Sequence, residues 1–159
     1  MRTRIVARAV VLDRDRNAIL LVRNKGAEYW YIPGGGWEAE RENILECAAR
    51  EVKEETGLEV TIGKFVYLQE FHASEDSIVF EAFYLACAVE DVTLDKNHID
   101  TDPDGAVGEA RWFTRDEAVA IEIYPKVFEK KFWDDLDGIV NGADRFIGVN
   151  GKTSKEGSE

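Results

Sequence analysis

The chain has 159 residues, 45% of them hydrophobic and 33% charged, with a net charge of −12 and a sequence pI near 4.7. This length and apolar content suit one globular domain with a single substantial core. Nucleic-acid-binding proteins usually carry a basic patch, and no basic run occurs here, so we expect no extended DNA or RNA partner.

The first third of the chain predicts a small set of strands followed by a helix. Residues 5–12 and 18–23 are apolar runs joined by a polar turn, which is typical of a β-hairpin. Residues 29–32 predict a short aromatic strand that Pro33 stops, and the glycines at 34–36 predict a tight turn. A helix is predicted over residues 43–56.

That predicted helix has a clear inner face and a clear end. Its apolar positions lie at helical spacing and form one stripe, which we expect to pack inward; they are Leu45, Ala48, Ala49 and Val52. Gly57 follows the last helical residue and is a plausible C-terminal stop.

The rest of the chain predicts further strands, a long loop and two helices. Residues 59–71 and 77–89 are β-rich, and residues 91–108 are an acidic loop of a length typical of functional lids, binding loops or disorder. Residues 110–113 predict a strand. Thr114 then caps a helix with Glu117 as the capping-box partner, and a last amphipathic helix is predicted over residues 124–137.

The domain organisation follows from these elements. Residues 1–147 predict one domain, and residues 148–159 are rich in glycine, serine, lysine and glutamate, which is typical of a disordered tail. Strands flanked by helices early and late predict an α/β layered domain. No apolar run reaches the roughly 18–20 residues that a membrane span needs, and no secretory signal opens the chain. We therefore expect a cytoplasmic protein with no membrane partner.

The cysteines and histidines predict no metal site of their own. Cys47 and Cys87 lie in a predicted helix and a predicted strand, and we expect both to be buried free thiols rather than a disulfide. His72 and His98 are far apart in the sequence, and the four residues together lack zinc-ligand spacing.

Three carboxylates share one face of the helix predicted over residues 43–56. With about 100° per residue, Glu55 lies near +40° and Glu54 near −60° from Glu51. Like charges at this spacing destabilise a helix by roughly 0.2–0.5 kcal/mol each, so a compensating group is expected. A hard divalent cation would suit carboxylate oxygens. The alternative is a solvated charged face, which would be preferred for an isolated pair of glutamates.

The residues around this cluster form a longer pattern. Its fixed positions are Gly36, Glu42, Arg50, Glu51, Val52, Glu54, Glu55, Gly57 and Leu58. This spacing resembles the signature of the Nudix hydrolases, and all nine constrained positions are filled. The resemblance extends over roughly residues 5–132, although only these positions are specific. It implies an α/β/α sandwich with a mixed β-sheet.

The resemblance also implies roles for the signature residues. Glu51, Glu54 and Glu55 would be ligands of Mg²⁺, for which Mn²⁺ can substitute, with Glu54 or Glu55 near the attacking water. The backbone carbonyl of Gly36 would be a further ligand. Arg50 would orient a catalytic glutamate, although it can also form a surface pair with Glu46 or Glu54 at i±4.

Five further residues are candidates for the site, and four of them have two possible roles each. Glu42 either caps the helix or supports the metal site, and the two are of equal weight. Arg23 is either a phosphate-binding cation or a surface arginine. Trp30 and Tyr31 can stack on a base, but aromatic residues at strand ends more often pack in a core. Glu81 is a candidate extra carboxylate, which would need a partner if buried.

The resemblance predicts the reaction better than the substrate. It implies hydrolysis of a phosphoanhydride bond in a small nucleotide, a nucleoside diphosphate linked to another moiety such as a nucleoside triphosphate, sugar nucleotide or ADP-ribose. The alternative is a catalytically silent nucleotide sensor. The segment from Trp37 to Glu42 lacks the second glycine that many members have, which leaves the loop geometry open. Many relatives are dimers, so a homodimer is also a hypothesis.

Overall fold

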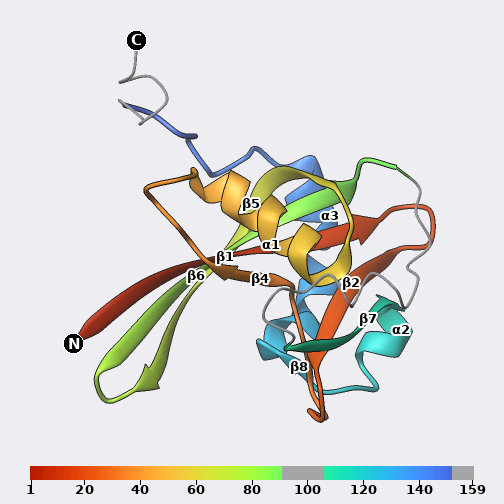
Figure 1. Ribbon diagram of the computed structural model, residues 1–159. Coiled ribbons are helices and arrows are strands. Elements are labelled where there is room, and N and C mark those ends of the chain that lie inside the picture. Colours follow the sequence, from red (N-terminus) through yellow and green to blue (C-terminus); the bar gives the residue numbers. More distant parts are fainter. Residues whose placement is uncertain (91–105, 152–159) are drawn as a thin grey trace.

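The computed structural model describes residues 1–90 and 106–151 (Figure 1). The strands are β1 (Arg2–Asp13), β2 (Ala18–Asn24), β3 (Trp30–Tyr31), β4 (Gly34–Gly36), β5 (Val60–Ser74), β6 (Ser77–Ala88), β7 (Val107–Thr114) and β8 (Ile123–Tyr124). The helices are α1 (Ile44–Thr56), α2 (Arg115–Ala118), α3 (Lys131–Asn141) and a 3₁₀ helix, η2 (Lys126–Phe128).

The strands form one mixed sheet built around β1. Its order is β5-β6-β1-β2-β3-β8, with β4 paired to β1 and β7 paired to β2. The β1–β6 and β3–β8 pairs are parallel and the others antiparallel. The ends of β1, β5 and β6 near the N-terminus extend away from the helices as an arm (Figure 1).

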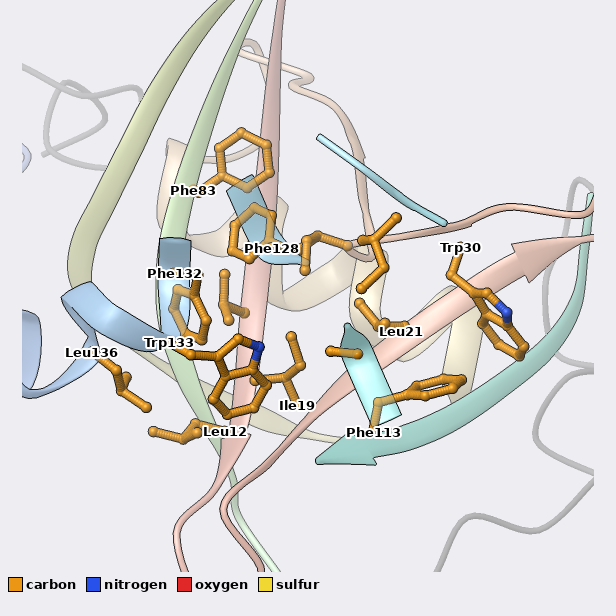
Figure 2. Packing of buried hydrophobic residues seen from close by; sticks show 14 residues of the cluster. Leu12, Ile19, Leu21, Trp30, Phe83, Phe113, Phe128, Phe132, Trp133 and Leu136 are labelled. Atoms are coloured by element: carbon orange, nitrogen blue, oxygen red, sulfur yellow. The ribbon is translucent and has the colours of Figure 1, made fainter. Parts of the chain in front are cut away.

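Alternation along β1 separates two cores. Ala7, Ala9 and Val11 belong to the cluster that contains residues of α1, whereas Val10 and Leu12 belong to the cluster with α3 and η2. Successive strand side chains point to opposite faces, so one strand serves both cores. Figure 2 shows the second cluster, in which side chains of β1 and β2 pack against Phe128, Phe132 and Trp133. The predicted α/β/α sandwich is confirmed.

The stop of α1 at Gly57 and the capping box of α2 lie where the sequence predicts them, whereas the N-cap of α1 is Asn43. Asn43 accepts a hydrogen bond from the Glu46 amide at 2.9 Å, and the Glu46 side chain accepts one from the Asn43 amide, which completes a capping box. Gly57 ends α1 with a left-handed φ of 79°. The predicted capping box at Thr114 and Glu117 is also present, on the short helix α2.

The predicted last helix begins too early. Tyr124 lies in β8, which pairs with β3, and only a 3₁₀ turn follows before α3 starts at Lys131. Pro125 explains the difference, because the residue before a proline is disfavoured in the α conformation and proline lacks an amide donor. The apolar spacing around Val127 and Phe128 therefore belongs to two short elements rather than to one helix.

Three other expectations change. The glycines at 34–36 form β4 against β1 instead of a tight turn. Cys47 is buried as expected, but Cys87 is exposed, and both are free thiols. Most of the predicted acidic loop, residues 91–105, and residues 152–159 of the predicted tail lie outside the described residues, while Val107 and Gly108 belong to β7.

In the parts of the chain that the structure describes, no helix is long and apolar enough to cross a membrane.

Candidate active site

Arg50 is the centre of a network of carboxylates on α1 and just before it. Its Nε and Nη2 atoms donate to the two oxygens of Glu42 at 2.8 and 2.7 Å. Its Nη1 atom donates to Glu51 at 3.0 Å and to Glu54 at 3.2 Å. One guanidinium therefore holds three glutamates, which offsets the repulsion that the sequence predicts.

The Glu42 carboxylate is fixed by this network rather than by helix capping. Asn43 is the N-cap, so the capping role considered for Glu42 belongs to its neighbour. The hydrogen bonds from Arg50 hold the pKa of Glu42 below its usual value, and the Glu38 amide also donates to it. In turn, the hydrogen bonds to Glu42 raise the pKa of Arg50. Glu42 therefore contacts Arg50 directly, and its supporting role at a metal site stays a prediction.

The glycines of β4 lie directly against the carboxylates of α1. A Cβ atom built on Gly35 would lie 2.5 Å from Oε1 of Glu51, so only glycine leaves room for that carboxylate. The Gly34 amide donates to Oε2 of Glu55 at 3.3 Å, and Glu55 is only 8% exposed. The contact with Glu51 accounts for the glycine at position 35, whereas a Cβ on Gly34 or Gly36 would meet Arg8 or Arg4 of β1.

The Gly36 carbonyl faces Arg50 and Cys47. It accepts a hydrogen bond from Nη2 of Arg50 at 3.3 Å and one from the Cys47 thiol at 3.5 Å. Burial raises the pKa of the Cys47 thiol to about 12, so this thiol is a protonated donor at neutral pH. The predicted role of Gly36 as a metal ligand stays a prediction.

The residues present fit a hard divalent cation by their chemistry. Glu51, Glu54 and Glu55 supply carboxylate oxygens, the donors that Mg²⁺ and Mn²⁺ prefer. As placed, no three histidine, cysteine, aspartate or glutamate side chains among the described residues converge closely enough to hold an ion together. Glu51 and Glu54 instead form ion pairs with Arg50. Ion binding would require these two carboxylates to rotate away from Arg50 toward Glu55.

A cavity of about 1160 Å³ opens beside this helix face. Gly34 and Glu55 line it together with Arg8 and Glu81, and an aromatic wall completes it. Glu81 is 8% exposed, and one of its oxygens accepts hydrogen bonds from Arg8 while the other accepts one from Gln69 at 2.7 Å. Arg8 and Gln69 are thus both hydrogen-bond partners of the buried Glu81 carboxylate.

Two predicted substrate-binding residues do not line the cavity. Trp30 is 3% exposed and packs edge to face on Phe113 with ring centroids 4.8 Å apart, so the core alternative applies to it (Figure 2). Arg23 pairs with Glu109, and its guanidinium carbon lies 4.5 Å from the Trp30 ring centroid. Strand alternation sends Tyr31, the neighbour of Trp30, to the cavity instead.

Several cavity residues were not identified from the sequence. They are Arg8, Asn24, Tyr29, Gln69, Tyr124 and Lys126. Arg8 lies in an apolar strand pattern that should favour apolar residues, and this mismatch was the one available signal. The others come from separate elements, and nothing in their local sequence predicts that they meet.

Comparison with known proteins agrees with the geometry. A model of the NUDIX domain matches residues 2–133. Nudix hydrolase 6 from Arabidopsis thaliana is 31% identical over 121 residues, which cover 73% of this chain and 41% of that protein. A mimivirus protein described as a putative mRNA-decapping protein is 33% identical over 107 residues, covering 64% of this chain and 29% of its own. The chain thus spans less than half the length of these two relatives.

Solved structures share the fold. A NUDIX hydrolase from Nitrosomonas europaea superposes with a TM-score of 0.72 at 21% identity, covering 94% of this chain and 98% of that one. A UDP-X diphosphatase superposes with a TM-score of 0.66 at 18% identity, covering 89% of this chain and 64% of that one. With the NUDIX model matching most of its length, the chain belongs to the Nudix family of hydrolases.

Proposed function

We propose that this chain hydrolyses a phosphoanhydride bond in a nucleoside diphosphate linked to another moiety, with Mg²⁺ or Mn²⁺ as cofactor. The observation that carries the proposal is the face of α1 on which Glu51, Glu54 and Glu55 lie, with Glu55 lining the large cavity. A nucleotide in that cavity would place its phosphates beside the carboxylates. The relatives whose names include hydrolase and diphosphatase support this reaction class.

The carboxylates of α1 are held by different groups and have different expected roles. Arg50 holds Glu51 and Glu54 on one side of the helix, and the Gly34 amide holds Glu55; to bind an ion, Glu51 and Glu54 would turn from Arg50 toward Glu55. Divalent cations bound there would polarise the phosphoryl oxygens and lower the pKa of a bound water. Glu54 or Glu55 is the candidate to orient the attacking water and accept its proton. Attack at phosphorus then breaks the bridging P–O bond, which releases two phosphorylated products.

Arg8 is a cation that lines the cavity. Its Nη1 atom donates to the Ile32 carbonyl at 2.9 Å, and its Nε atom donates to Glu81 at 3.0 Å. These bonds position Arg8 to receive a substrate phosphate, while Glu81 limits its charge. The assignment of Glu81 as a substrate-binding carboxylate stays a prediction.

The second candidate function is a catalytically silent nucleotide sensor. Such a protein would keep the cavity and lose a carboxylate of the signature. Here all four signature carboxylates are present, and Arg50 links three of them, Glu42, Glu51 and Glu54, which favours the hydrolase.

The test is a phosphate-release screen. Purified protein would be assayed against nucleoside triphosphates, sugar nucleotides, ADP-ribose and dinucleoside polyphosphates, with Mg²⁺, with Mn²⁺ and with chelator. Glu54→Gln is the active-site variant, and Glu59→Gln, at an exposed pair with Lys53, is the matched control. Metal-dependent turnover lost in Glu54→Gln alone would support the hydrolase. Nucleotide binding with no turnover would favour the sensor.

A homodimer stays a prediction. Leu68 is 63% and Phe71 50% exposed on β5, an edge strand of the arm. Exposed apolar side chains on an edge strand favour association with another chain. Analytical ultracentrifugation of the wild type and of Leu68→Ser would test this prediction. The expected cytoplasmic location is a separate prediction, which cell fractionation would test.

A further inference from the structure

Two partly exposed tyrosines meet in the wall of the cavity. Tyr29 is 38% and Tyr124 43% exposed, and both line the cavity. Their ring centroids are 5.2 Å apart with an interplanar angle of 89°. Large aromatic side chains at this exposure leave much apolar ring surface in contact with water, so a flat ligand would gain by covering it.

The backbone holds this pair in place. Parallel pairing of β3 with β8 sets Tyr31 directly opposite Tyr124, and Tyr29 immediately precedes β3. The Tyr124 hydroxyl donates to Glu122 at 2.5 Å, and the Tyr31 hydroxyl donates to Asn24 at 2.5 Å. The Tyr124 ring is therefore anchored through its hydroxyl, and both Tyr29 and Tyr124 line the cavity.

The cavity has room for a base as well as for phosphates. Its volume of about 1160 Å³ exceeds the 300–1000 Å³ or so that is typical of small-ligand pockets. Gly34, which contacts Glu55, is five residues after Tyr29, so their Cα atoms are at most about 18 Å apart. One molecule with a base at one end and a diphosphate at the other can thus reach both ends.

We propose that Tyr29 and Tyr124 form a stacking subsite for the nucleobase of the substrate. This inference rests on the proposed function, because it assigns the non-phosphate end of the same cavity. Aromatic stacking accepts any base, since every base has a π face, so the subsite selects base-containing diphosphates over base-free ones without reading the base identity.

Lys126 now occupies a position over one of these rings. Its ammonium nitrogen lies 4.8 Å from the Tyr124 ring centroid, and its side chain is 58% exposed. It also pairs with Glu129 at 3.2 Å and with Glu122 at 3.8 Å. An exposed lysine on a flexible stem can move aside, so an arriving base displaces the ammonium group from the ring face and leaves its ion pairs in place.

The test compares binding of ADP with binding of inorganic pyrophosphate by calorimetry, in the wild type, Tyr29→Ala, Tyr124→Ala and the two Tyr→Phe variants. In the wild type we expect ADP to bind more tightly than pyrophosphate. Each alanine variant should lose about tenfold or more of its ADP affinity and little pyrophosphate affinity. The phenylalanine variants should recover most of the loss, because they keep the ring. Equal ADP affinity in wild type and alanine variants, with matching melting curves, would overturn the proposal.

Kinetics separate this proposal from the proposed hydrolase. With a substrate found in the phosphate-release screen, the alanine variants should raise KM far more than they lower kcat. If no substrate is turned over but the base-dependent binding is seen, the hydrolase fails and the subsite stands. If turnover is seen with the same KM in the alanine variants, the subsite fails and the hydrolase stands.

Discussion

Arg50 donates a bidentate pair of hydrogen bonds to Glu42, from Nε at 2.8 Å and from Nη2 at 2.7 Å. The Glu42 side chain is only 8% exposed, so this fork is shielded from solvent on one side. The remaining donor of the guanidinium, Nη1, is then directed at Glu51 and Glu54. Glu42 thereby decides where the charge of Arg50 points.

Replacing Glu42 should disturb both stability and activity. Glu42→Gln keeps the size but removes the charge that orients Arg50, and hydrogen bonds to charged groups contribute about 1.5–3 kcal/mol. We expect unfolding free energy to fall by roughly 1–2 kcal/mol, since Arg50 is partly solvated. We also expect kcat/KM to fall by about tenfold or more, as when a group supporting a metal ligand is lost.

Denaturant titration and steady-state kinetics would measure the effects of Glu42→Gln. Glu38→Gln, which removes a more exposed carboxylate that pairs with Arg41, is the matched control and should change neither quantity appreciably. Wild-type kcat/KM in Glu42→Gln would show that the orientation of Arg50 does not matter.

The same fork predicts a pH dependence of stability. The pKa of Glu42 is below its usual value of 4.5 in the folded protein because Arg50 donates to its ionised form. A carboxyl group with a depressed folded pKa contributes stability above its unfolded pKa and loses it as the pH falls through the folded pKa. Stability should therefore decline below about pH 4.5 more steeply in the wild type than in Glu42→Gln. Urea unfolding across that range measures the difference, and parallel curves would contradict it.

A side chain at Gly35 should displace the Glu51 carboxylate. The Cβ of Gly35→Ala would lie 2.5 Å from Glu51 Oε1, so the carboxylate would have to move off β4. We expect weaker binding of Mn²⁺, by about 10–100-fold, as for other losses of ligand support. Titration with Mn²⁺ followed by paramagnetic resonance measures this directly, without relying on turnover.

Gly138→Ala is the matched control for Gly35→Ala. Nothing lies within 4 Å of the Cβ that it would add, and Gly138 lies inside α3. It should stabilise the protein by about 0.5–1 kcal/mol, because alanine has the higher helix propensity. The affinity for Mn²⁺ should not change. Equal Mn²⁺ affinity in both variants would argue against a metal-supporting role of the Gly35–Glu51 contact.

The Arg8–Glu81 pair should be costly to break from one side. Glu81→Ala would leave the Arg8 guanidinium without its carboxylate in a largely buried site, where the side chains are 19% and 11% exposed. Breaking a buried pair in this way lowers the unfolding free energy by roughly 3–5 kcal/mol. Because Arg8 keeps some exposure, we expect a loss of about 3 kcal/mol.

A double-mutant cycle with Arg8→Met and Glu81→Ala, followed by thermal unfolding, measures the coupling of that pair. We expect the double variant to lose less unfolding free energy than the two single variants lose together, because neither charge is then left without its partner. Additive losses would mean that the two side chains do not depend on each other.

Local features of the chain were predictable because local chemistry determines them. The stop at Gly57 and the acidic face of α1 depend on residues within one or two turns of a helix. The same holds for Thr114 and Glu117. Periodicity also predicted the inward stripe of α1, of which Ala48 and Val52 are buried.

Tertiary structure decided which residues share the cavity. Arg8 and Glu81 are 73 positions apart in the sequence and meet because β1 and β6 pair in parallel. Tyr29 and Tyr124 meet because β3 pairs with β8. The register of such long-range pairs depends on the packing of the whole sheet, which no local pattern encodes. The sequence by itself thus determined the acidic helix and its chemistry, whereas strand pairing decided what surrounds them.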